Sequence, residues 1–275
     1  MSRLLLSVAL ALIFMSTAVF DMSAQEDARV VTAGGSVTEI LHALGAGKSL
    51  VAVDTSSTYP AAVNQLPKVG YYRQLPIEGI VALRPDLVIG VDGVGPTRVL
   101  QQLRSLGIQV EQIQVEKSVA GLLSMIRQTA ELVDKQSAGE ALVYQVQSEF
   151  AEIATLSEQG GRAAFLMNIN ERGMLVAGQN TVPDLIYTLA GTQNVFADVT
   201  GFKPLSSEAF LQRMPDWLMI PEHQRQGMQA EQFCAMPALK RWAQHSGCRI
   251  VFVDPLLFLG LTPRLPDAVR QVMAM

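Results

Sequence analysis

One segment of the chain occurs twice, and this repeat limits the folds that the chain can adopt. Residues 78–87 read EGIVALRPDL, and residues 208–218 read EAFLQRMPDWL. In each copy a glutamate stands seven residues before a Pro-Asp pair, and a β-rich run follows that pair. Residues 33–45 and 177–191 also share a small-residue turn, an acidic residue and an apolar helix closed by glycine. Two such matches in the same order indicate two lobes with a common plan.

Strand and helix signals alternate around these segments. β-rich runs occupy residues 29–32, 50–53, 87–91 and 108–113, and helical spacing occupies residues 37–44, 77–83 and 94–106. Ser36 is expected to cap the first of these helices, with Glu39 as its partner in a capping box. Such alternation predicts a parallel sheet with helices on both faces.

Residues 118–156 interrupt the alternation with a long helical stretch that contains no proline. Its part beyond Ser137 is predicted to be one helix of about twenty residues, roughly 30 Å long. We therefore expect an α/β fold of two Rossmann-like lobes with parallel sheets, at residues 28–117 and 160–275, joined by a long helix within a linking segment at 118–159. Open parallel sheets bind ligands beyond the carboxyl ends of their strands, so two facing lobes predict a ligand cleft between them.

The first residues predict export. Arg3 precedes an apolar run at residues 4–20, which is typical of a secretory signal peptide at residues 1–24, cleaved after Ala24. A retained membrane anchor is the alternative, although the run is shorter than the ~20 residues that a spanning helix needs. No cysteine lies near the cleavage point, which argues against a lipid anchor.

Charge and motif content narrow the functional classes. The formal net charge is -4, and no basic stripe is present to neutralise phosphates, so nucleic acid is not an expected partner. The sequence has no G-x-S-x-G and no H-E-x-x-H motif, which makes an exported enzyme the less favoured class. Cys234 and Cys248 could form a disulfide in an oxidising compartment or remain two buried thiols.

Three segments read GGSVTEILHALG at residues 34–45, DTSSTYP at 54–60 and LPKVGYYRQLPIEGIVALRPDLVIG at 66–90. Together they resemble the periplasmic haem-binding proteins of bacterial haem ABC importers. The resemblance spans nearly the whole chain from Arg29 onward, and its Gly-Tyr-x-Arg turn is what favours haem. Cobalamin- and siderophore-binding relatives share the plan of two α/β lobes on a long helix. The same architecture with cobalamin or a ferric siderophore as cargo is therefore the alternative.

The resemblance implies that Tyr71, directly after the glycine, is the axial ligand of haem iron. A phenolate is a hard oxygen donor that suits iron(III), and a nearby guanidinium favours the anionic form of a tyrosine. In an extended segment residues i and i+2 share a face, so Tyr71 and Arg73 are expected to point together while Tyr72 points away. A tyrosine pair that only closes a turn is the alternative.

A loop of the second lobe provides further candidates. Some similar proteins have a histidine after the first strand of that lobe, but residues 165–178 contain none. Residues 221–228, PEHQRQGM, follow a predicted strand at 217–220. In that loop Arg225 could hydrogen-bond the phenolate or a haem propionate, and His223 could bind iron from the opposite side.

The repeated glutamates have a separate implied role. Glu78 and Glu208 occupy matching positions on the two lobes, and in similar proteins such a pair docks on arginines of the permease dimer in the inner membrane. Two separated charges fix orientation and speed association more than they add affinity. The alternative is that both only stabilise helix N-termini. The resemblance thus implies a periplasmic protein, without catalytic residues, that passes haem from an outer-membrane receptor system to an ABC importer.

Overall fold

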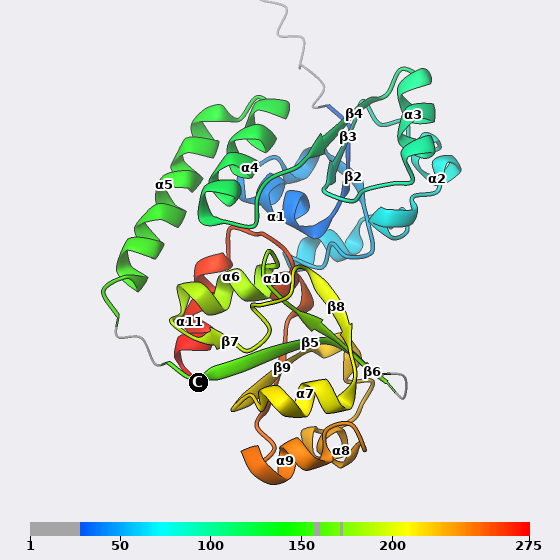
Figure 1. Cartoon of the computed structure of the whole chain (residues 1–275). Helices are drawn as coiled ribbons and strands as arrows, with labels where there is room; N and C mark the ends of the chain where they lie inside the picture. Colours follow the sequence, from blue (N-terminus) through cyan, green and yellow to red (C-terminus); the bar gives the residue numbers. More distant parts are fainter. Residues whose placement is uncertain (1–27, 157–159, 171–172) are drawn as a thin grey trace, which may run out of the picture.

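The computed structural model describes residues 28–156, 160–170 and 173–275. The predicted signal peptide at residues 1–24 lies outside the described residues. In the described part of the chain, no helix is long and apolar enough to cross a membrane. Two lobes lie one above the other in Figure 1, and a pair of long helices runs along one side.

The first lobe is built on a four-stranded parallel sheet with the strand order β2-β1-β3-β4. Its strands are β1 (Val30–Ala33), β2 (Leu50–Val53), β3 (Leu87–Val91) and β4 (Gln109–Ile113). Its helices are α1 (Gly35–Ala43), α2 (Ile77–Val81) and α3 (Thr97–Ser105), with short 3-10 turns η1 (Gly47–Ser49), η2 (Ala61–Gln65) and η3 (Tyr72–Gln74). The parallel sheet predicted for this lobe is confirmed.

The linking segment consists of two helices, α4 (Val119–Leu132) and α5 (Gln136–Ile153). They separate at Asp134, whose φ of 53° is left-handed. They then pack together, because Gly139 of α5 lets its backbone approach Ala130 of α4, and Arg127 pairs with Glu140 through contacts of 2.7 and 3.1 Å. α5 has 18 residues and is the predicted long helix that leads to the second lobe.

The second lobe has a six-stranded mixed sheet with the order β10-β9-β5-β6-β8, and β7 pairs with β5. Its strands are β5 (Arg162–Asn170), β6 (Gly173–Ala177), β7 (Gln193–Asn194), β8 (Phe202–Leu205), β9 (Trp217–Pro221) and β10 (Ile250–Val253). Its helices are α6 (Val182–Leu189), α7 (Ser207–Arg213), the 3-10 turn η4 (Glu222–Gln224), α8 (Ala230–Ala235), α9 (Lys240–Ser246), α10 (Pro255–Leu259) and α11 (Leu265–Met273). The prediction of a wholly parallel sheet is wrong here, because β6 and β8 run antiparallel. The connection from β5 to β6 is too short for the crossover that a parallel pair needs.

The repeated segments fold alike in both lobes. In each lobe an arginine at the start of the central strand donates its backbone N–H to the aspartate of the Pro-Asp pair. The same guanidinium donates to two carbonyls of the turn before that pair. The residues involved are Arg29, Asp86, Leu83 and Arg84 in the first lobe, and Arg162, Asp216, Arg213 and Met214 in the second. α2 and α7 are therefore equivalent helices.

The two lobes also share a buried core. One continuous cluster of buried apolar side chains extends from α1 and α4 through α5 to α6, α10 and α11. Beyond this cluster, buried Leu256 of α10 lies directly against Gly35 of α1, where a Cβ would collide with it. Moving the lobes apart would expose this apolar surface to water, at a free-energy cost of about 25 cal/mol for each Å² exposed. The lobes therefore behave as one packed body at this contact.

Candidate functional site

The carboxyl ends of the two sheets face each other between the lobes. Arg264, which follows β10, donates from Nε and Nη2 to the carboxylate of Glu39 on α1, at 2.9 and 2.8 Å. Its guanidinium carbon lies 3.6 Å from the ring centre of Tyr59, which follows β2. We call this region, formed by the loops after β1, β2, β3, β9 and β10, the interlobe face. Open α/β sheets bind ligands at such an edge.

Two open depressions lie elsewhere on the described surface. One, of about 610 Å³, is lined by residues at the amino ends of β3 and β4, including Asp86 and Gln109. The other, of about 450 Å³, lies beside β6 and β8 and is lined by Met174 and Pro204 among others. Neither contains a candidate residue, so the interlobe face remains the site to consider.

Backbone hydrogen bonds hold the turn that carries Tyr71. The Thr55 N–H donates to the Gly70 carbonyl at 2.8 Å, and the Gly95 N–H donates to the Tyr72 carbonyl at 3.0 Å. Gly70 has a φ of 87°, a conformation that favours glycine. The loops after β2 and β3 thus fix the tyrosine turn from both sides.

Tyr71 and Tyr72 differ in burial. Tyr71 is 46% exposed, whereas Tyr72 packs against the core of the first lobe. The two rings meet edge to face with their centres 4.8 Å apart. Burial raises the pKa of Tyr72 to about 12, since the loss of water disfavours its phenolate more than the charge of Arg73 favours it. Of the two phenols, Tyr71 is therefore the one placed to offer its oxygen to a ligand.

The local geometry of Arg73 differs from the expectation. The segment is not extended, because the Gln74 N–H donates to the Tyr71 carbonyl at 2.8 Å and closes the turn η3. The guanidinium carbon of Arg73 lies 4.9 Å from the ring centre of Tyr72 and packs against Gly93. Partial burial disfavours its charge, but the phenols of Tyr72 and Tyr71 outweigh this and raise the pKa of Arg73. A permanent positive charge thus lies beside both phenols.

The second-lobe candidates lie in the loop after β9. His223 is exposed, and partial desolvation lowers the pKa of its imidazole, which leaves a neutral nitrogen lone pair at pH 7. Arg225 donates to the Met228 carbonyl at 2.9 Å, to Glu222 at 3.2 Å and to the Gln229 side chain at 2.6 Å. Arg225 therefore stabilises its own loop, and it would have to exchange one of these bonds to reach a ligand.

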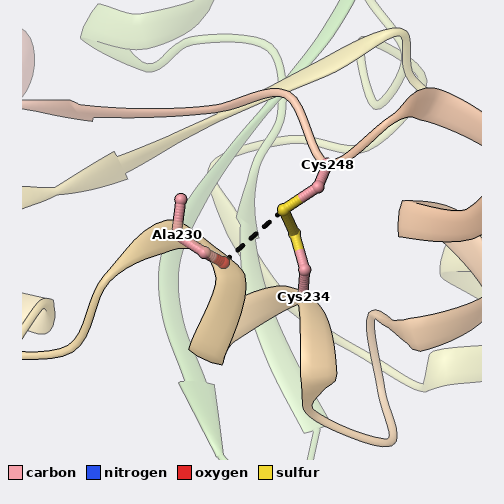
Figure 2. Close-up of a disulfide and its surroundings, with 3 residues drawn as sticks. All are labelled: Ala230, Cys234 and Cys248. Atoms are coloured by element: carbon pink, nitrogen blue, oxygen red, sulfur yellow. Dashed lines mark hydrogen bonds between the residues drawn. A yellow bond between two sulfur atoms is a disulfide. The ribbon is translucent and has the colours of Figure 1, made fainter.

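A disulfide supports the same corner of the second lobe. Cys234 and Cys248 are joined, with their Cα atoms 5.9 Å apart, so the disulfide is the alternative that the structure contains (Figure 2). The Cys248 sulfur lies 3.6 Å from the Ala230 carbonyl oxygen, a contact only, because a disulfide sulfur has no proton to donate. Gln229, the partner of Arg225, directly precedes Ala230 at the start of α8. The disulfide and Arg225 thus hold neighbouring parts of one loop and helix.

Glu78 and Glu208 lie in the first turns of the equivalent helices α2 and α7. Both residues are exposed. Ser206 caps α7 and accepts a hydrogen bond from the Ala209 N–H at 3.3 Å. Hydrogen bonds to the backbone N–H of Glu208 and to Ser206 lower the pKa of the Glu208 carboxyl. Each lobe therefore presents one glutamate at the same position of its fold.

The facing lobes and their interlobe face define a two-lobe substrate-binding protein. Residues 30–243 match the family described as periplasmic binding protein, and the chain belongs to that family. The family and the similar solved structures are binding proteins, and the family name indicates a periplasmic location.

Some of the proteins similar to this chain are named as heme-binding proteins and others as vitamin B12-binding proteins. The periplasmic heme-binding protein RhuT from Roseiflexus sp. RS-1 has 33% sequence identity and a TM-score of 0.84, over 90% of this chain and 97% of that one. The periplasmic heme-binding protein HutB of Vibrio cholerae has 35% identity and a TM-score of 0.80, over 90% and 98%. A vitamin B12-binding protein of Vibrio parahaemolyticus is 28% identical over 225 residues, which are 79% of this chain and 81% of that protein.

Proposed function

We propose that this protein captures haem in the periplasm and delivers it to the permease of an ABC importer. The observation that carries the proposal is the exposed Tyr71 on a turn that the loops after β2 and β3 fix in place. Ferric haem iron takes a phenolate as axial ligand. Tyr71 would supply that phenolate, and the positive charge of Arg73 lies beside both phenols of the turn.

The loop after β9 would act from the second lobe. The neutral imidazole of His223 suits a second iron ligand, since a metal binds the unprotonated nitrogen. Arg225 would hydrogen-bond a propionate or the Tyr71 phenolate after releasing Glu222 or Gln229. Both roles require the cargo to span the space between the lobes.

Cobalamin is the second candidate cargo, because curated relatives that cover most of this chain are vitamin B12-binding proteins. A cobalamin or ferric siderophore site would rely on aromatic walls or basic residues and would not need Tyr71 as a ligand. The two cargoes therefore differ in what they require of one side chain.

A haemin titration of the chain from Gln25 onward, followed by visible absorbance, tests the proposal. We expect saturable binding with a phenolate-to-iron charge-transfer band, which Tyr71→Phe removes or shifts. Tyr72→Phe is the matched control. It should retain the band, because burial keeps the hydroxyl of Tyr72 protonated and Tyr72 is therefore not the phenolate ligand. Absence of saturable haemin binding to the unaltered protein would exclude haem, and saturable binding of cyanocobalamin would then identify the second cargo.

A further inference from the structure

Arg264 lies at the centre of a cluster that joins the two lobes. Besides its two hydrogen bonds to Glu39, its guanidinium lies 3.8 Å from the carboxylate of Asp254. The side chain of Glu39 is 3% exposed and that of Arg264 is 18% exposed. A fork-to-fork pair that is this well shielded from water is stronger and more specific in direction than a surface ion pair. The pair therefore fixes how the segment after β10 meets α1.

Glu39 does not cap α1 as the sequence predicted. The cap residue is Gly34, which makes no side-chain hydrogen bond, and Ser36 lies inside the helix. Glu39 is one turn further along and binds Arg264 instead. Burial raises the pKa of Glu39, and the hydrogen bonds and charge of Arg264 act against that rise. Each of the two carboxylate oxygens of Glu39 accepts one hydrogen bond from Arg264, which is the bidentate geometry of a carboxylate paired with a guanidinium.

Arg264 also covers one face of Tyr59. The guanidinium lies 3.6 Å from the ring centre, and 42% of Tyr59 remains exposed at the interlobe face. A guanidinium over a phenol ring is an attractive cation–π contact. The ring is thus held by the second lobe, although it belongs to the first.

The loop that carries Tyr59 is bonded to the turn that carries Tyr71. Lys68 Nζ donates to the Ser57 carbonyl at 2.8 Å, and the Thr55 N–H reaches Gly70 as described above. The two exposed tyrosines therefore lie on one connected framework along the same edge of the first-lobe sheet.

We infer that Tyr59 is a second cargo-contact residue and that Arg264 is its positioning residue on the opposite lobe. The cargo class is a flat, largely apolar macrocycle, because the exposed phenol ring offers apolar contact area. Glu39 and Asp254 already neutralise the charge of Arg264, so Arg264 is not free to hold an anionic group. The inference rests on the proposed function, since it assigns a contact within the same site.

Haemin titrations of Tyr59→Leu, Tyr59→Phe and Tyr144→Leu test the contact. Tyr144 is the matched control, because it lies on α5 and is 74% exposed. We expect Tyr59→Leu to weaken haemin binding roughly fivefold, and Tyr59→Phe to stay within about twofold because it keeps the ring. Tyr144→Leu should bind as the unaltered protein does. All three should keep the charge-transfer band, since Tyr71 is intact.

Arg264→Lys tests the positioning role. Lysine keeps the charge but lacks the flat fork that pairs with Glu39 and stacks on Tyr59. We expect a loss of haemin affinity close to that of Tyr59→Leu, and little further loss when the two changes are combined. A purely structural role would lower the melting temperature and leave haemin affinity unchanged.

The outcomes separate this inference from the proposed function. Equal haemin affinities of Tyr59→Leu and Tyr144→Leu would overturn the inference and leave haem capture intact. If the unaltered protein binds cyanocobalamin and not haemin, the proposed cargo is wrong, and the inference then stands only if Tyr59→Leu weakens cyanocobalamin binding. Saturable binding of neither compound would overturn both.

Discussion

At the scale of single residues, one glycine leaves the space in which the guanidinium of Arg73 lies over the ring of Tyr72. Gly93 follows β3 and has a φ of 78°. A Cβ built on it would collide with the guanidinium of Arg73. Because Arg73 lies over Tyr72 from this position, the space left by Gly93 is part of what keeps its charge beside both phenols.

Gly93→Ala should therefore displace Arg73, and Gly107→Ala is its matched control. Gly107 has a φ of 83° and no atom within 4 Å of the position its Cβ would take. Both variants should lose about 1 kcal/mol of unfolding free energy to the left-handed backbone. Only Gly93→Ala should also weaken haemin binding, by about three- to tenfold. Urea unfolding and haemin titration measure the two effects, and equal haemin affinities in both variants would contradict the role given to Arg73.

The imidazole of His223 makes stability depend on pH. Desolvation lowers its pKa in the folded protein below the ordinary 6.5, so the unfolded chain takes up this proton first as the pH falls. The unfolding free energy should therefore decrease as the pH falls below 6.5, and His223→Gln should remove that part of the decrease. Urea midpoints between about pH 7.5 and 5.5 measure it, with His245→Gln on α9 as control. An unchanged pH slope in His223→Gln would be inconsistent with this assignment.

At the scale of elements, the sequence predicted what local signals determine. Helical spacing predicted α5, and the glutamate with its Pro-Asp pair predicted the equivalence of α2 and α7. The turn η3 was missed, because the backbone of Gly95, a residue of another loop, holds it in place. The antiparallel β6 and β8 were also missed, since alternating strands and helices do not reveal a hairpin. Tyr71 was predicted as the iron ligand from a family resemblance, and that role stays a prediction; the structure shows only that Tyr71 is the more exposed of the two tyrosines.

The disulfide between Cys234 and Cys248 should stabilise the second lobe measurably. The two residues are separated by 14 positions. Closing a loop of about 15 residues removes chain entropy worth about 3 kcal/mol from the unfolded state. Replacing both cysteines by alanine should lower the unfolding free energy by about that amount. Urea unfolding with and without dithiothreitol checks this: the reductant should bring the unaltered protein to the level of the variant and leave the variant itself unchanged. Identical unfolding midpoints of the two proteins without reductant would rule out this contribution.

At the scale of the whole molecule, the shared core and the Glu39–Arg264 pair determine how the lobes are related. The partners are 225 residues apart in the chain, which is why no local pattern could predict their contact. Their bond lies where α1 meets the segment after β10, beside the apolar contact of Leu256 with Gly35. We expect the lobes to keep nearly the same separation with and without cargo, since both contacts would have to break for wide opening. Small-angle scattering before and after haemin addition measures this, and a large change in radius of gyration would contradict it.

A fixed relation between the lobes also fixes the distance between Glu78 and Glu208, so the pair can serve as a two-point docking pattern for a permease. Removing both charges should leave haemin affinity unchanged, because neither residue lies at the interlobe face. Transfer of haem to vesicles that contain the permease should fall at least about tenfold in Glu78→Ala/Glu208→Ala, and the transfer rate of the unaltered protein should fall with added salt. Glu131→Ala/Glu231→Ala removes the same net charge from exposed positions on α4 and α8 and is the matched control. If the control slows transfer as much, net charge and not the paired positions would determine docking.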